Sequence, residues 1–136
     1  MILIDTGPIV AMIDRSDEHF EATIKTILDV DDDFTTTEAC LTEAIYLIGK
    51  SSGWPGVRLL RDAIVDGAIR VIATGDDWYV RSFRYMERFV DQPCDYADAT
   101  LLVASEDTGI RQVLTLDRHF FAYRLASGEA INVLRP

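Results

Sequence analysis

The stretch Ile2-Leu3-Ile4-Asp5-Thr6-Gly7-Pro8, at the start of the chain, decides the fold. Three consecutive apolar residues followed by Asp-Thr-Gly-Pro are typical of a buried strand that ends in a turn. Proline is well accepted in the first turn of a helix, so we expect a short helix from Pro8 to Ile13. A buried strand followed directly by a helix indicates a parallel sheet whose connections are helical.

The rest of the chain repeats this alternation. We expect further strands at 34–36, 69–73, 112–115 and 130–134. We expect further helices at 20–28 (capped by Asp17), 37–50, 57–66, 77–90 and 96–106, with Trp54-Pro55-Gly56 as a break between two of them. The pattern predicts the α/β class, with a parallel sheet covered by helices on both faces and residues 1–136 forming one domain.

Composition excludes several classes of protein. With 136 residues, 49% of them hydrophobic, the chain can bury a core. It has 23 acidic against 13 basic residues and a net charge of −10, which argues against a protein held on nucleic acid by bulk positive charge. No apolar run approaches the roughly 20 residues of a membrane helix, the N-terminus does not resemble a signal peptide, and two cysteines make no disulfide framework. We therefore expect a cytoplasmic protein.

Four acidic residues fall where a parallel sheet would bring them together. Asp5 and Asp117 each follow a strand, so both lie at the carboxyl edge of the sheet, where open α/β folds place their ligand sites. Glu43 lies in the second turn of the helix after the second strand, and Asp98 lies in the first turn of the helix before the fourth strand. Both helix starts reach the same edge.

Such a group of carboxylates favours a divalent cation. Each close pair repels by about 4 kcal/mol at 4 Å and an effective dielectric of 20, and protonation or a cation must relieve this repulsion. Oxygen donors without a His or Cys cluster point to Mg²⁺ or Mn²⁺, which suits phosphodiester hydrolysis. Taken singly, each of three acids has another possible role: Asp5 as a turn former, Asp98 as a charge at a helix start, and Asp117 as a loop cap. Glu43 has no such alternative role.

These residues also carry a family resemblance. The matching stretches are 2–8, Leu41-Thr42-Glu43-Ala44, Asp95-Tyr96-Ala97-Asp98-Ala99 and Leu114-Thr115-Leu116-Asp117-Arg118-His119-Phe120. In order and spacing they resemble PIN-domain ribonucleases, and among these the VapC-type toxins of toxin–antitoxin pairs. The resemblance implies a three-layer α/β/α fold with a central parallel sheet and Mg²⁺- or Mn²⁺-dependent endoribonuclease activity on RNA.

The resemblance also implies roles for individual residues and partners. Asp5, Glu43, Asp98 and Asp117 would be the catalytic, metal-binding acids, with direct ligation by Asp117 left open. Thr6 and Thr115 would support these acids or contact substrate. The implied partners are a small VapB-like antitoxin and a second copy of the chain in a homodimer.

Basic residues near the expected site are few. Arg118 follows Asp117 and is the best single candidate for a phosphate contact. One helix face also carries three arginines, Arg81, Arg84 and Arg88. They either bind phosphates or pair on a solvated surface with the nearby acids Asp77, Glu87 and Asp91, and we prefer the second. Asp95 lies one turn before Asp98 on the same helix face, where it is either a helix cap or an added metal ligand, and we prefer the cap.

Two other classes of protein compete with a nuclease. A catalytically silent PIN-like interaction module would keep the fold and the acids without turnover. Asp5-Thr6-Gly7 also spells the triad of an aspartic protease half-domain, but such proteins consist mostly of β-hairpins and this chain is largely helical by its periodicity.

Overall fold

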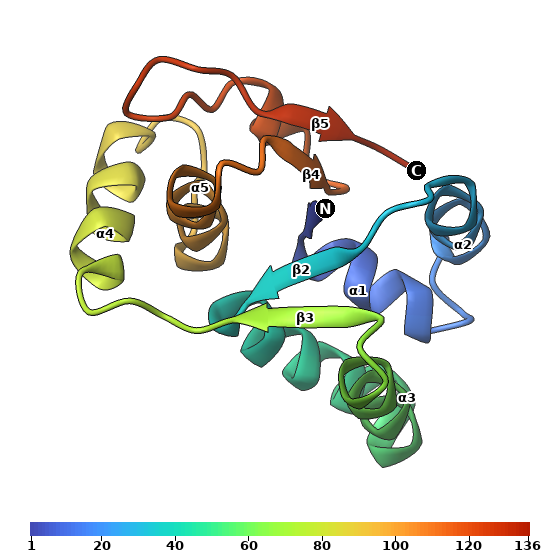
Figure 1. Cartoon of the computed structure of the whole chain (residues 1–136). Coiled ribbons are helices and arrows are strands. Elements are labelled where there is room, and N and C mark those ends of the chain that lie inside the picture. The colour runs from blue at the N-terminus through green and yellow to red at the C-terminus, as the bar shows by residue number, and fades with distance from the viewer.

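A computed structural model describes all residues from Met1 to Pro136, which are built around one five-stranded sheet (Figure 1). The strands are β1 (Ile2–Ile4), β2 (Phe34–Thr37), β3 (Ile69–Ile72), β4 (Gln112–Leu114) and β5 (Asn132–Leu134). They lie in the order β3-β2-β1-β4-β5, and every neighbouring pair is parallel. The apolar run that opens the chain is therefore the central strand of the sheet.

Helices cover both faces of this sheet. They are α1 (Thr6–Ile13), α2 (Phe20–Asp29), α3 (Glu38–Val65), α4 (Trp78–Arg88), α5 (Tyr96–Thr108) and the 3-10 helix η1 (Arg118–Phe121). Figure 1 shows α4 and α5 on one side of the sheet and α1, α2 and α3 on the other. The predicted α/β/α fold with a central parallel sheet is confirmed, and the aspartic protease alternative is wrong. None of the helices is both long and apolar enough to cross a membrane.

Side chains of β1 show how the two layers form. Ile2 and Ile4 are buried in a cluster that includes Ile9 of α1, whereas Leu3 belongs to a second cluster with Leu101 of α5. Successive side chains of a strand point to opposite faces, so an uninterrupted apolar run contributes to both cores. Asp5, directly after this run, is thereby fixed at the centre of the carboxyl edge.

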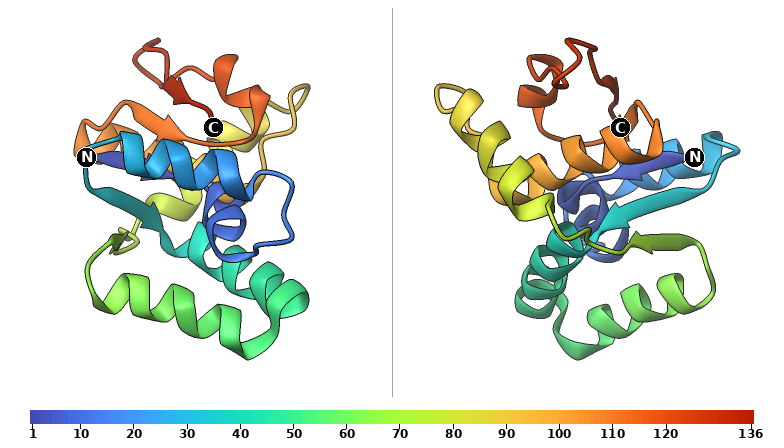
Figure 2. Two further views of the ribbon diagram at one scale, coloured as in Figure 1. Left: turned by 90° about the vertical axis from the view of Figure 1, so that its right-hand side faces the viewer. Right: turned by 60° about the vertical axis from the view of Figure 1, so that its left-hand side comes forward.

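The helices expected at 37–50 and 57–66 form one bent element, α3. Within it Gly53 has non-helical backbone angles, φ 62° and ψ −163°. Pro55 lies in the first turn of the second half, where a missing N–H removes no helical hydrogen bond. The predicted interruption is therefore correct in place but much shorter than expected, and Figure 2 shows the two halves meeting at an angle.

Two smaller expectations are wrong. Asp17 does not cap α2, because its Oδ1 accepts the N–H of His19 in the preceding turn, at 2.8 Å, and α2 begins at Phe20. The last strand is shorter than expected, since Ala130 forms only an isolated antiparallel bridge with Arg124. In both places local hydrogen bonds to a turn compete with the regular element.

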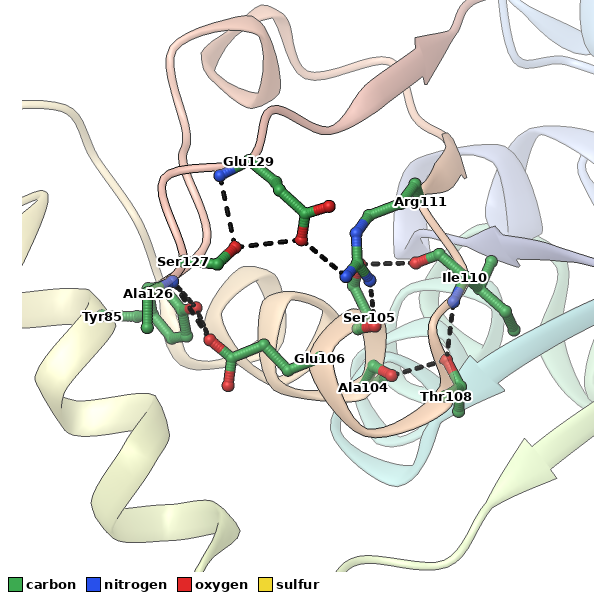
Figure 3. Close-up of polar contacts among 10 residues, drawn as sticks. All are labelled: Tyr85, Ala104, Ser105, Glu106, Thr108, Ile110, Arg111, Ala126, Ser127 and Glu129. Atoms are coloured by element: carbon green, nitrogen blue, oxygen red, sulfur yellow. Dashed lines mark hydrogen bonds and ion pairs between the residues drawn. The ribbon is translucent and has the colours of Figure 1, made fainter.

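Hydrogen bonds fasten the C-terminal segment to the α4–α5 layer (Figure 3). The Glu106 carboxylate accepts the hydroxyl of Tyr85 and the N–H of Ala126. Arg111 donates to Glu129 at 2.8 Å. Arg111 also donates to the carbonyl of Ser105 in α5 at 2.6 Å, so these bonds fasten the C-terminal segment to the end of α5 that lies away from Asp98.

Candidate metal centre

Asp5 is built into the junction between β1 and α1. Its Oδ1 accepts the N–H of Thr6 at 2.7 Å, so Asp5 is the N-cap of α1, which begins before the expected Pro8. Its Oδ2 accepts the hydroxyl of Thr115 at 2.7 Å. Only 6% of the residue is exposed. Both carboxylate oxygens are therefore held in a fixed orientation at the sheet edge.

Asp98 is held by the start of α5. Asp95 Oδ1 accepts the N–H of Asp98 at 2.8 Å, and Asp98 Oδ2 accepts the N–H of Asp95 at 3.2 Å, which together form a capping box. The predicted capping role of Asp95 is confirmed. Asp98 is buried, and its Oδ1 makes no hydrogen bond to the protein.

Glu43 projects from the second turn of α3, and its Oε2 accepts the hydroxyl of Thr6 at 2.9 Å. The buried Ala44 and Ile48 anchor this part of the helix in the core. Glu43 itself is only half-buried. Thr6 therefore connects Glu43 with Asp5.

Asp117 is the N-cap of η1 and also contacts its own loop. Its Oδ1 accepts the N–H of His119 at 2.9 Å and lies 2.6 Å from Nδ1 of the same residue. Thr115 accepts the N–H of Asp117 at 2.9 Å while donating to Asp5, so its hydroxyl bridges the two acids. Arg118 is exposed and makes no ion pair.

The structure brings all four predicted acids to one pocket, which has a volume of about 380 Å³. Its lining consists of Asp5, Thr6, Gly7, Glu43, Leu47, Asp95, Asp98, Leu116 and Asp117. Five of these side chains are carboxylates, and none is cationic. At Gly7 an added Cβ would lie 3.3 Å from Cδ1 of Leu116, so glycine lets α1 and the loop after β4 approach closely. The sequence pattern did not single out Leu47 and Leu116 as lining residues. Asp95, whose place one turn before Asp98 had left both a capping role and metal ligation open, caps α5 and also lines the pocket.

The pocket opposes negative charge. Burial raises the pKa of Asp5 to about 6, although hydrogen bonds from Thr115 and Thr6 act in the other direction. Burial, and then repulsion from Asp5 and Asp95, raises the pKa of Asp98 to about 8. Without a cation these two acids therefore retain protons to higher pH than ordinary carboxyls. No cationic side chain lines the pocket, so a bound cation would supply the counter-charge that the ionised acids need.

The donors fit a hard divalent cation. They are all oxygens, since no histidine or cysteine lines the pocket. No group of three or more His, Cys, Asp or Glu side chains is already arranged to hold a metal ion, so the carboxylates share a pocket without forming a closed cage. Mg²⁺ retains several waters and binds through few carboxylates, which an open arrangement of this kind suits.

The arginines of α4 divide into two groups. Arg81 pairs with Glu106 at 2.6 Å and Asp107 at 2.8 Å, both on α5. Arg84 and Arg88 make no ion pair and line a separate cavity of about 230 Å³. Of the predicted pairing acids, only Asp77 forms an ion pair, with Arg81 at 3.6 Å, so the preferred prediction holds for that pair and is wrong for Glu87 and Asp91.

The fold and the site together define an α/β/α protein with an acidic pocket at the carboxyl edge of a parallel sheet. The chain belongs to the PIN-domain family, whose model matches residues 2–125. It is 25% identical over 134 residues to Ribonuclease VapC26 of Mycobacterium tuberculosis (strain ATCC 25618 / H37Rv), covering 98% of this chain and 99% of the relative.

A solved structure shows the same fold. The crystal structure of Mycobacterium tuberculosis VapC20, described as a Sarcin-Ricin loop cleaving toxin, matches with a TM-score of 0.77 and 16% sequence identity. The match covers 83% of this chain and 87% of that chain.

Proposed function

We propose that this protein is a Mg²⁺- or Mn²⁺-dependent endoribonuclease and the toxin of a VapC-type toxin–antitoxin pair. The observation that carries the proposal is the single pocket shared by Asp5, Glu43, Asp98 and Asp117, in which no cationic side chain balances the acids. Membership of the PIN-domain family and similarity to Ribonuclease VapC26 over nearly the whole chain support RNA as the substrate.

Each acid has a part in this proposal. Asp5 and Asp98, the two buried acids, would hold the cation, and Glu43 and Asp117 would complete its surroundings directly or through water. When bound, such an ion polarises a phosphoryl oxygen and lowers the pKa of a water molecule. Thr6 and Thr115 orient the acids through their hydroxyls, and loss of supporting contacts of this kind typically lowers metal affinity or activity about 10–100-fold.

The reaction is hydrolysis of a phosphodiester bond. A water oxygen forms a bond to phosphorus, the bond from phosphorus to the 3′ oxygen breaks, and that oxygen leaves with a proton. The products carry a 5′-phosphate and a 3′-hydroxyl. Arg118, exposed beside Asp117, would contact a phosphate of the RNA, and Leu47 and Leu116 would limit access of bulk water to the pocket.

The partners follow from the same proposal. A VapB-like antitoxin would block the acidic pocket with a short segment, for which an arginine side chain has the complementary charge. We also propose that the whole chain acts as one domain, that it forms a homodimer and that it acts in the cytoplasm.

Cleavage of RNA by purified protein tests the proposal. The wild-type chain is incubated with total cellular RNA and Mg²⁺ or Mn²⁺, with a chelator in parallel, and new 5′ ends are mapped. We expect discrete new 5′-phosphate ends with the metal, none with the chelator, and none with Asp5→Asn. Circular dichroism checks that the variant is folded.

Asp31→Asn is the matched control, because Asp31 is an exposed acid outside the pocket and makes no ion pair. This variant should cleave like the wild type. Cleavage by Asp5→Asn at the wild-type rate would overturn the assignment of the site. Absence of cleavage by the wild type with either metal would favour the catalytically silent interaction module.

A further inference from the structure

A second, larger groove opens beside the carboxylate pocket. It has a volume of about 670 Å³ and is lined by Ala39, Thr42, Glu43, Tyr46, Asp95, Tyr96 and Ala97. Glu43 and Asp95 line both the groove and the carboxylate pocket, so the two spaces are adjoining. A ligand in the groove would lie next to a bond cleaved in the pocket.

Tyr46 gives this groove an aromatic wall. It follows Glu43 by one turn of α3, and 63% of the residue is exposed. The Lys50 ammonium lies 5.3 Å from the centroid of its ring. An exposed ring of this kind contributes little to the core and is available to a flat ligand.

Tyr96 lines the groove from the first residue of α5. Its ring lies 6.0 Å, centroid to centroid, from that of Phe83 on α4. The groove therefore has tyrosines on both of the helices that form it.

Charge decides which part of an RNA strand fits. The charged residues lining the groove are Glu43 and Asp95, so a phosphate there would be repelled. A nucleobase is neutral, stacks on aromatic rings and offers N–H groups that carboxylates accept. The ammonium of Lys50, outside the groove lining, is suited to the adjoining backbone phosphate.

We propose that this groove binds an unpaired nucleobase adjacent to the scissile phosphate, stacked on Tyr46, with Lys50 close to the backbone. The inference rests on the proposed ribonuclease function and adds a positioning site for single-stranded substrate. Pockets that enclose small ligands typically measure about 300–1,000 Å³, a range that includes this groove.

A fluorescent base tests the stacking directly. The probe is a short single-stranded RNA of mixed sequence that carries 2-aminopurine, titrated into the Asp5→Asn protein. We expect the emission of 2-aminopurine to fall on binding. Adding Tyr46→Ala should remove this quenching and weaken binding about 5–150-fold, the range expected for loss of one base–aromatic stack. Tyr46→Phe should restore both signals.

Kinetics in the otherwise wild-type chain provide the second readout. Tyr46→Ala should raise KM for a single-stranded RNA by a similar factor and change kcat much less, since Tyr46 contacts a base and not the reacting phosphate. Tyr79→Ala is the matched control, because Tyr79 lies on α4, outside the groove, and is 57% exposed. It should behave like the wild type in both measurements.

The outcomes separate this inference from the proposed function. Normal cleavage with unchanged quenching and KM in Tyr46→Ala would overturn the base site and leave the ribonuclease intact. A change of sedimentation coefficient in Tyr46→Ala would also overturn it, because the groove would then be a contact between copies of the chain. Failure of the wild type to cleave RNA would instead refute the ribonuclease proposal, on which this inference depends.

Discussion

The side chain of Asp98 is held by a hydrogen bond in a place where its ionisation is unfavourable. The hydrogen bond from the N–H of Asp95 fixes Asp98 Oδ2 and caps α5. Burial and the neighbouring acids Asp5 and Asp95 oppose ionisation of the same carboxyl. The helix start therefore holds this acid in place whether or not its charge is compensated.

The Asp98 carboxyl should make the metal-free protein less stable as the pH rises. Its pKa is about 8 in the folded chain against an ordinary 3.8, so between these values the folded state binds more protons than the unfolded state, and stability falls with rising pH. Asp98→Asn removes this dependence and keeps an oxygen that can accept the N–H of Asp95. At pH 8 with a chelator we expect the variant to be more stable by at least about 1.4 kcal/mol, with a Tm higher by about 3–5 °C.

Thermal unfolding between pH 5 and 8.5 measures this effect. The Tm curves of wild type and Asp98→Asn should lie closest together at pH 5, the low end of this range, and separate further as the pH rises. Asp31→Asn, an exposed acid, should follow the wild type throughout. Parallel curves for wild type and Asp98→Asn would show that Asp98 has an ordinary pKa.

At this scale the sequence predicted which acids lie together, because the ends of strands and the starts of helices determine where side chains emerge. It did not predict their surroundings. Spacing does not show that Glu43 is only half-buried and that Leu47, one turn away, is 39% exposed. The bridge from Thr115 to Asp5 and Asp117 joins residues far apart in the chain, which spacing alone does not reveal.

Among the elements, α3 links the pocket and the groove to the far side of the sheet. Its first half carries Glu43 and Tyr46, and Leu60 in its second half packs in the same core cluster as Ile69 of β3. The bend at Gly53 lets one element serve both places. The conformation of Gly53 therefore sets the angle between the half of α3 that carries Glu43 and the half that packs beside β3.

Replacing this glycine should destabilise the protein. Gly53 has φ 62° and ψ −163°, a region essentially restricted to glycine, and a side chain there costs about 1–3 kcal/mol. We expect Gly53→Ala to lower the free energy of unfolding in urea by that amount. Gly49→Ala is the control: its Cβ would lie 3.9 Å from Val57 Cγ2, an ordinary contact within a helix, so this change should be neutral or stabilising by up to about 1 kcal/mol. Equal stability of Gly53→Ala and wild type would show that the bend does not depend on this residue.

The boundaries of α3 show what the sequence could and could not predict for an element. Gly53 and Pro55 correctly marked an interruption of the helix. The interruption is a single non-helical residue, Gly53, because Pro55 fits in the first turn of the helix that follows. The sequence alone does not distinguish such a bend from a loop, since packing of both halves on the same core decides it.

Considered as a whole molecule, the protein has acids in excess, with a net charge of −10, and a few unpaired cations such as Lys50, Arg84, Arg88 and Arg118. Non-specific attraction to RNA is therefore weak, and binding must depend on the pocket, the adjoining groove and individual basic side chains. The fold class was predictable because each of the first three strands is followed by at least one α-helix before the next strand begins. The strand order was not, because it depends on which strands pair across the chain.

The most direct test of the central claim is a crystal of the protein grown with Mn²⁺, with anomalous scattering recorded near the manganese absorption edge. The claim is that the pocket lined by Asp5, Glu43, Asp98 and Asp117 binds a divalent cation. It predicts an anomalous peak within this pocket and none in crystals of Asp5→Asn. A peak only at the acidic loop 31–33, or no peak in the pocket at saturating Mn²⁺, would contradict it.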